Sequence, residues 1–358
     1  MNKNLKLVRQ IFSNTMIVVL SITICLLFLE LTLRIYNSFI DLVDSYPNVI
    51  TYESVNPNSP HIYDSVLGWS LKPGYKRIVK FSSSEEPRKI GENGIVINQD
   101  GFRTSIKKSI VDLDKSKILV LGDSMVFGLS AQQEEIFTEK LNAKQKKVIF
   151  VNAGVSGYST AQEYLVLQKY IAISNVKMVI LFHTLSNDMW MNVQSGGFNP
   201  SVKLNDGQLV FTKPSPMYSL PLYKRTMLFK FANKQWLRGR DLIYLFHRLD
   251  FEIRGSQSDV WKIQSKLIQE MSNLAKQSSI PLVVIDIPTQ NQLNKSITSQ
   301  KRQHLMSQLC KDNQITYYSL IDLYPKEWSN LFVKNDTHWN DLGHTFVANF
   351  IENVVLKN

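Results

Sequence analysis

Five short runs of Val, Ile and Leu, separated by helix-like stretches, most constrain the fold of this 358-residue chain. The runs lack the strict apolar–polar alternation of a half-exposed strand, so each predicts a strand that is buried on both faces. Buried strands that alternate with amphipathic helices are typical of a parallel sheet covered by helices on both sides. The runs are KILVLGD, KKVIFVNAG, VKMVILFHT, PLVVIDIP and TYYSLIDL, between residues 117 and 323.

This pattern predicts an α/β fold, namely a flavodoxin-like three-layer α/β/α sandwich with a five-stranded parallel sheet. Right-handed crossovers connect the parallel strands of such a fold. Because the strands are parallel, their carboxyl ends lie at one edge of the sheet. Ligands of such folds bind beyond that edge. The residues that follow each strand are therefore the first place to look for a functional site.

The first 36 residues predict a transmembrane helix. Residues 1–10 carry three basic side chains and no acid, and residues 11–29 are 19 residues without a charge. That length is close to the ~20 residues that span a bilayer as a helix. The positive-inside rule then places residues 1–10 in the cytoplasm, an anchor at residues 11–36 in the cytoplasmic membrane, and the rest outside. A cleaved signal peptide is the alternative, although no small-x-small site directly follows residue 29.

The charge and the cysteines exclude some classes of function. A net charge of +11 favours an anionic partner such as a membrane surface or an acidic polymer. Nucleic acid is not expected, because no helix-turn-helix, zinc-finger or aromatic RNA-binding motif is present. Cys25 and Cys310 are too few for a disulfide framework. No His or Cys cluster has metal-ligand spacing, so neither a metal nor a cofactor is predicted.

The chain divides into an N-terminal region and a main domain. Residues 37–114 are rich in turns and prolines, and they predict a stalk and a small β-rich collar that packs on the main domain. Residues 115–358 form the predicted sandwich. Within it, residues 190–261 are a basic and aromatic insertion, for which we consider a lid or substrate wall that faces the membrane or a glycan. An ordinary amphipathic helical excursion is the alternative for this insertion.

Chemistry-bearing residues follow the predicted strands. Ser124 follows the first strand in GDS, and the second ends in NAGVSGYST at residues 152–160. Asn187 follows the third strand in LSND, and NDTHWNDLGH at residues 335–344 follows the last. A nucleophile, oxyanion donors, a base and an orienting acid are the components of an acyl-transfer site. Taken alone, Asp123 and Ser124 are equally good helix-capping residues.

These four blocks resemble those of the SGNH/GDSL hydrolase superfamily, which occur in this order on this fold. The chain is most similar to the membrane-anchored bacterial branch with an N-terminal helix, an LGW-LKP segment and a D-x-H-W-N ending. The resemblance runs from about residue 115 to the C-terminus, and a looser one reaches back to about residue 63.

The resemblance implies a role for each matching residue. Ser124 is the expected nucleophile, His338 the general base, and Asp336 the acid that orients the base. The expected oxyanion donors are the backbone N–H groups of Ser124 and Gly157 and the side-chain amide of Asn187. If the second block is misaligned, Gly154 replaces Gly157 as the donor.

Two positions depart from the usual family pattern. The third block usually reads G-x-N-D, but Leu185 stands in place of the glycine. The acid usually stands three residues before the histidine, where this chain has Asn335. Asp336, two residues before His338, matches the anchored branch instead. A Ser–His dyad supported by a backbone carbonyl is the alternative.

The remaining polar residues are expected to be structural. Asp123 is expected to bond the backbone around the nucleophile turn, and His344 to pack at the start of the last helix. The other histidines lie outside any partner pattern; they are His61, His183, His247 and His304.

The resemblance implies acyl-ester chemistry outside the cytoplasmic membrane. The expected partners are an ester or glycan substrate, the membrane, and a membrane protein that donates an acyl group. An O-acetyltransferase or deacetylase of cell-envelope glycans fits these partners, with a general carboxylesterase or lipase as the second choice. A non-catalytic glycan-binding or assembly subunit that retains the fold is the contrasting class.

Overall fold

The computed structural model divides by contacts into two units, residues 1–50 with 218–243 and residues 51–217 with 244–358. Each unit is described by itself. The structure describes residues 3–43, 59–77, 94–173, 175–184, 188–193, 199–214, 247, 249–288, 297–325, 327–334 and 336–357.

Helix α1 (Lys3–Val43) is the described part of the first unit. Its segment Phe12–Thr32 has 21 residues, and its side chains are not buried within the protein. At 1.5 Å per residue, such a segment is about 31 Å long, which matches the thickness of a hydrocarbon core. This helix is therefore long and apolar enough to cross a membrane, and it suits either an anchor or a signal sequence.

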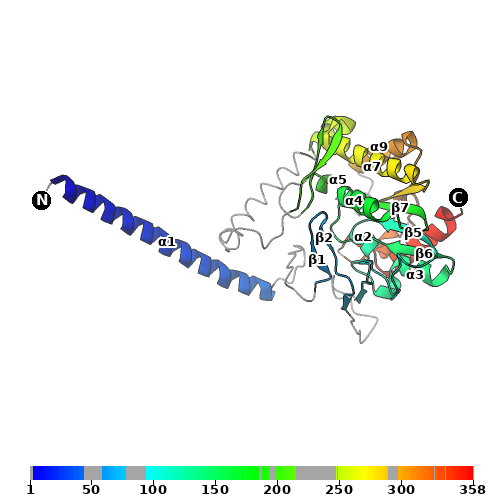
Figure 1. The fold of residues 1–358 in the computed structure, drawn as a ribbon, viewed down its shortest axis with the longest axis horizontal. Coiled ribbons are helices and arrows are strands. Elements are labelled where there is room, and N and C mark those ends of the chain that lie inside the picture. Colours follow the sequence, from blue (N-terminus) through cyan, green and yellow to red (C-terminus); the bar gives the residue numbers. More distant parts are fainter. Residues whose placement is uncertain are drawn as a thin grey trace. The chain divides into compact units, whose positions relative to one another are not determined.

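The second unit is built on a five-stranded parallel sheet with the order β11-β10-β7-β5-β6 (Figure 1). Numbered along the chain, this order is 2-1-3-4-5, which is the flavodoxin-like arrangement. The prediction of a doubly wound parallel sheet is confirmed. The strand order reverses between β5 and β7, so their carboxyl ends flank the switch point where ligands bind. The strands are β5 (Ser116–Leu121), β6 (Val148–Asn152), β7 (Val176–Thr184), β10 (Leu282–Ile287) and β11 (Thr316–Ser319).

Helices cover both faces of this sheet (Figure 1). Ile118 and Val120 of β5 pack in one apolar cluster with residues of helices α3 and α10. Leu119 and Leu121 pack in the opposite cluster with residues of α4, α7 and α9. The two-residue period of a strand sends neighbouring side chains to opposite faces, so both faces of β5 are apolar. The helices are α3 (Phe137–Lys144), α4 (Thr160–Tyr170), α7 (Asp259–Gln277), α9 (Ile297–Asp312) and α10 (Asp341–Phe350).

The described part of the collar, residues 59–77 and 94–114, contains two small antiparallel pairs. Strand β1 (His61–Asp64) pairs with β2 (Gly68–Leu71), and β3 (Lys76–Arg77) pairs with β4 (Ile95–Val96). Trp69, Ile97 and Phe102 of the collar lie in the same buried cluster as Leu119 of the sheet. One hydrophobic core therefore runs across residue 114, and the collar has no separate core of its own among the described residues.

The insertion contains a β-hairpin that the sequence analysis did not predict. Strands β8 (Val202–Asn205) and β9 (Gln208–Phe211) are joined by Asp206 and Gly207, which have φ of +49° and +75°. Positive φ at both central residues is typical of a type I′ turn, for which Asp-Gly is a preferred pair. Phe211 stacks on Tyr164 of α4. Residues 215–246, which hold most of the basic segment and of the hypothetical lid, lie outside the described residues.

Short elements complete the described part of the second unit. They include the 3-10 helices η1 (Gln133–Glu135), η4 (Gly255–Gln257), η5 (Leu320–Asp322) and η6 (Trp328–Leu331), the helix α5 (Asp188–Met191), and the π-helical turn η7 (Ile351–Val355).

His344 lies in the core between α10 and α3. It is 1% exposed, its ring stacks on Phe137, and its Nδ1 accepts a long hydrogen bond of 3.4 Å from the Phe137 N–H. Burial lowers the pKa of His344 to about 3, and the positive charges of Arg103, Lys140 and His338 act in the same direction. The folded protein therefore keeps this histidine neutral.

This burial predicts a measurable pH dependence of stability. Below pH ~6.5 an unfolded chain protonates the histidine while the folded chain does not, so folding loses up to about 1.4 kcal/mol per pH unit. In the His344→Gln variant this loss is absent. The difference in unfolding free energy between wild type and variant should therefore shrink steadily from about pH 6 to about pH 4. Denaturant unfolding measures this difference, with the exposed His304→Gln as control; a difference that stays constant with pH would contradict it.

Candidate active site

Ser124, His338 and Asp336 lie in one hydrogen-bonded row. His338 Nε2 lies 2.8 Å from Ser124 Oγ, although the two residues are 214 positions apart in the chain. His338 Nδ1 lies 2.6 Å from Asp336 Oδ1. The side chains of His338 and Asp336 are 18% and 9% exposed, so solvent reaches the histidine while the carboxylate is largely covered. This arrangement has the geometry of a nucleophile, a base and an orienting acid.

Ser124 begins a single helical turn, α2 (Ser124–Phe127), directly after β5. The N-cap Asp123 is 1% exposed, and its Oδ1 accepts a hydrogen bond of 2.9 Å from the Met125 N–H. The Ser124 N–H opens the turn and has no acceptor among the described residues, as expected of the first N–H groups of a helix. One turn carries little of the dipole of a long helix, so electrostatic help for an anion here comes from local N–H groups.

The loop between β6 and α4 carries the two candidate glycines, of which Gly154 lies close to this turn. The Gly154 N–H donates to Asn152 Oδ1 at 3.1 Å, so this donor is already used. A Cβ at Gly154 would lie 2.6 Å from the backbone N of Phe127, so only glycine permits this close approach. By contrast, the Gly157 N–H has no acceptor within the described part of the chain. Of the two candidates, Gly157 is the one with a free donor.

The loop before α10 holds the histidine rigidly. Val333 N–H donates to the His338 carbonyl at 2.9 Å and closes the loop. The next residue, Trp339, is 1% exposed, and its indole N–H donates to the Tyr324 hydroxyl at 2.9 Å. Asn340 caps α10, since its Oδ1 accepts from Leu342 N–H and Gly343 N–H. The Asn340 amide also donates to two main-chain carbonyls of the preceding loop, those of residues 330 and 332.

Interactions with His338 lower the pKa of the Asp336 carboxyl. Burial by itself raises the pKa of the Asp336 carboxyl, but hydrogen bonds from the His338 ring and backbone, together with the His338 charge, lower it below its ordinary value. The Asp336 carboxylate is therefore ionised at neutral pH. An ionised carboxylate on Nδ1 fixes the tautomer that leaves Nε2 free to accept a proton from Ser124.

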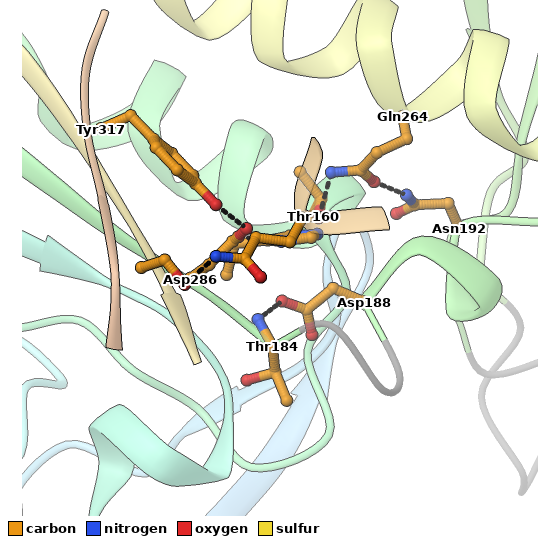
Figure 2. A network of polar contacts seen from close by, with 10 residues as sticks. Thr160, Thr184, Asp188, Asn192, Gln264, Asp286 and Tyr317 are labelled. Atoms are coloured by element: carbon orange, nitrogen blue, oxygen red, sulfur yellow. Dashed lines mark hydrogen bonds and ion pairs between the residues drawn. The ribbon is translucent and has the colours of Figure 1, made fainter. Parts of the chain in front are cut away.

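Asn187, the third expected oxyanion donor, lies outside the described residues, as do Leu185 and Asn335. The chain on either side of Asn187 is fixed by Asp188, whose Oδ2 accepts a hydrogen bond of 2.6 Å from the Thr184 N–H. Figure 2 shows this contact, with the Asp188 carboxylate directed at the backbone of the end of β7.

Three buried acids lie near the site, and the sequence analysis gave a role to only one of them, Asp123, whose expected bond to the backbone of the turn is present. Asp123, Glu163 and Asp188 are each at most 1% exposed. Burial raises the pKa of Glu163 well above its ordinary range, and the Asp123 charge adds to this effect. Burial also raises the pKa of Asp188, with the charges of Glu163 and Asp123 adding to it. The available signal was that Glu163 occupies the same helix face as buried Val166 and Leu167.

A second polar network lies under the carboxyl edge of β7 and β10 (Figure 2). Asp286 contacts His183 Nδ1 at 2.8 Å and accepts a hydrogen bond of 2.6 Å from the Tyr317 hydroxyl. His183 is 2% exposed, and its ring is bonded to Asp286 in the interior. Gln264 of α7 bridges Thr160 and Asn192, at 3.2 and 2.7 Å, and so joins α4, α5 and α7. Within the described residues, no group of three or more His, Cys, Asp or Glu side chains could hold a metal ion.

No family model matches this chain, and no curated protein matches it. Among solved structures, the chain is similar to the psychrotrophic esterase EstA from Pseudoalteromonas sp., with 15% identity over 68% of this chain and 98% of that chain and a TM-score of 0.39. It is also similar to a lipolytic protein of the G-D-S-L family from Veillonella parvula, with 15% identity, 68% and 100% coverage and a TM-score of 0.39.

A third similar structure is the acetyl xylan esterase AlAXEase, with 14% identity over 67% of this chain and 99% of that chain and a TM-score of 0.39. At TM-scores below 0.5, these likenesses add no argument to the sheet order and the site geometry described above.

Proposed function

We propose that this chain is a serine esterase or O-acyltransferase of the SGNH/GDSL type, acting on acyl esters of cell-envelope glycans or lipids. The observation that carries the proposal is the Ser124–His338–Asp336 row, with contacts of 2.8 and 2.6 Å, beyond the carboxyl edge of a parallel sheet. The N–H groups of Ser124 and Gly157, which have no acceptor among the described residues, support the proposal, because acyl transfer needs donors for a developing oxyanion.

In the first half of the reaction, Ser124 Oγ attacks the ester carbonyl while its proton moves to His338 Nε2. The tetrahedral oxyanion accepts hydrogen bonds from the N–H groups of Ser124 and Gly157 and from the Asn187 amide. Asp336 stabilises the imidazolium that forms. The intermediate collapses to an acyl-serine, and the leaving alcohol takes the proton from His338 Nε2.

In the second half, His338 accepts a proton from the incoming hydroxyl, which attacks the acyl-serine and restores free Ser124. If water attacks, the reaction is hydrolysis; if a sugar hydroxyl attacks, it is acyl transfer. Both outcomes use the same residues. The proposed acyl group is acetyl. The proposed donor is a membrane protein, because α1 suits a membrane anchor, which would tether the site to the membrane.

Two other functions are the alternatives to this one. A general carboxylesterase or lipase would use the same row with a less selective acceptor. A non-catalytic glycan-binding or assembly subunit would have no use for three side chains in hydrogen-bond contact. The row therefore favours an enzyme over a binding subunit.

A fluorophosphonate probe tests whether Ser124 is a nucleophile. The probe phosphonylates an activated serine oxygen and releases fluoride. We expect labelling of the full-length protein in detergent, none in Ser124→Ala, and a rate about 10²-fold to 10⁴-fold lower in Asp336→Asn, which keeps the shape but removes the charge. Ser265→Ala on the exposed side of α7 serves as a matched control. A folded wild-type protein that stays unlabelled would favour the binding subunit.

An acceptor experiment separates transfer from hydrolysis. With p-nitrophenyl acetate as donor, we expect acetylated oligosaccharide when an envelope-type oligosaccharide is present, because a bound sugar hydroxyl competes with water for the acyl-serine. Mass spectrometry detects the product, with Ser124→Ala as the control for uncatalysed acetylation. Release of p-nitrophenol without any acceptor-dependent product would assign the protein to the general esterases.

A topology experiment tests the proposed anchor. We propose a single-pass helix with the N-terminus in the cytoplasm and the site outside, because the basic residues precede the apolar segment. Protease added to spheroplasts should then digest a C-terminal tag and leave an N-terminal tag intact on a short membrane fragment. A protected C-terminal tag would contradict the orientation, and a mature protein that has lost its N-terminal tag would identify a cleaved signal sequence.

A further inference from the structure

Arg103 of the collar is a buried cation that binds the C-terminal end of α2, the helical turn that Ser124 begins. It is 0% exposed, and its Nη1 donates to the carbonyls of Phe127 and Gly128 at 2.7 and 2.6 Å. These carbonyls lie at the C-terminal end of α2, the turn that Ser124 begins. The same guanidinium lies over the Phe127 ring, 4.8 Å from its centroid. The collar is thus fastened to the short element that aims Ser124.

Arg103 also binds a neighbouring collar segment and the chain that follows this turn. Its Nη2 donates to the carbonyls of Gly94 and Ala131 at 2.9 and 3.0 Å, and its Nε donates to Gln133 Oε1 at 3.2 Å. Burial lowers the pKa of Arg103 to about 9, so the group stays charged at neutral pH. A planar guanidinium can reach four carbonyls at once, which the single ammonium of a lysine cannot do.

A second part of the collar holds the loop that carries Gly157. Trp69 Nε1 donates to the carbonyl of Ser156 at 3.1 Å, directly before Gly157. The Tyr158 hydroxyl, directly after Gly157, donates to the Trp69 carbonyl at 2.6 Å. Gln162 on the following helix donates to the Leu67 carbonyl at 2.7 Å. These contacts bracket Gly157 on both sides and are buried, so water does not replace them.

We propose that the collar is a positioning element of the active site: Arg103 fixes the turn of Ser124, and Trp69 and Tyr158 fix the loop of Gly157. The two backbone N–H donors of the oxyanion site are thereby held in register by residues that never touch the substrate. This inference rests on the proposed function, since the donors matter only if Ser124 reacts.

Small displacements of these donors are expected to slow the reaction strongly. A misplacement of about 1 Å in an active site costs roughly 10²-fold in rate, because the donors no longer meet the oxyanion. Substrate in its ground state gains little from these donors, so its binding should change less than the rate. Loss of a positioning contact should therefore appear in kcat and leave KM nearly unchanged.

The test uses the full-length protein in detergent and counts competent sites before measuring rates. Fluorophosphonate labelling to completion gives the fraction of sites that react, and hydrolysis of p-nitrophenyl acetate gives kcat per labelled site. The variants are Trp69→Phe and Tyr158→Phe, which keep an aromatic ring but remove one donor, and Arg103→Lys. Matched controls are Tyr164→Phe on α4 and Lys266→Arg, a cation of α7 that pairs with Glu270.

We expect kcat per labelled site to fall about tenfold or more in each collar variant, with KM within about twofold of wild type and both controls unchanged. Parallel loss of affinity for a boronic acid, which forms a tetrahedral anion on serine, would support the same conclusion. Fewer labelled sites with a wild-type kcat per site would overturn the proposal, because the collar would then only stabilise the fold. Should Arg103→Lys fail to fold, the two aromatic variants still decide. A wild type that does not label at all would overturn the proposed function and this inference together.

Discussion

Strand β5 is apolar on both faces, because Ile118 and Val120 face one layer of helices while Leu119 and Leu121 face the other. Residues 118–121 of this strand are all apolar and buried, since an unpaired polar group in the interior costs free energy. Chemistry is therefore confined to the edge where the strands end. Ser124 stands at that edge, at the switch between β5 and β7, and the loop before α10 brings His338 to it.

The sheet was predictable because burial on both faces leaves a direct mark on the sequence, namely uninterrupted apolar runs. The contact between Ser124 and His338 spans 214 residues, so no periodicity encodes it; the positions of both residues after predicted strands and the resemblance pointed to it. The sequence analysis did not predict the β8–β9 hairpin, although the Asp-Gly pair in its turn is a recognised hairpin signal. Arg103 and Glu163 were missed because charged residues are normally read as surface, and their burial depends on partners from distant segments.

Several ionisable groups lie in the interior around the site, and the surroundings of each group determine whether it is charged. Arg103 stays charged because it is surrounded by carbonyl oxygens. Burial raises the pKa values of Glu163 and Asp188, and neighbouring acids add to this: Asp123 acts on Glu163, and Glu163 and Asp123 act on Asp188. His344 stays neutral in the core. Unlike those of Glu163 and Asp188, the pKa of Asp336 is lowered, because this carboxyl is bonded to His338; the negative charge therefore lies beside the histidine.

The collar contacts described above end almost entirely on main-chain oxygens. Arg103 meets the carbonyls of four residues, and the contacts of Trp69 and Tyr158 also end on carbonyls. A carbonyl is present whatever side chain a residue carries. Substitutions along the gripped segments can therefore accumulate during divergence without removing an acceptor, provided that the backbone path is kept. We therefore expect related chains to vary more along the segments that supply the carbonyls than at Arg103, Trp69 and Tyr158, which supply the donors.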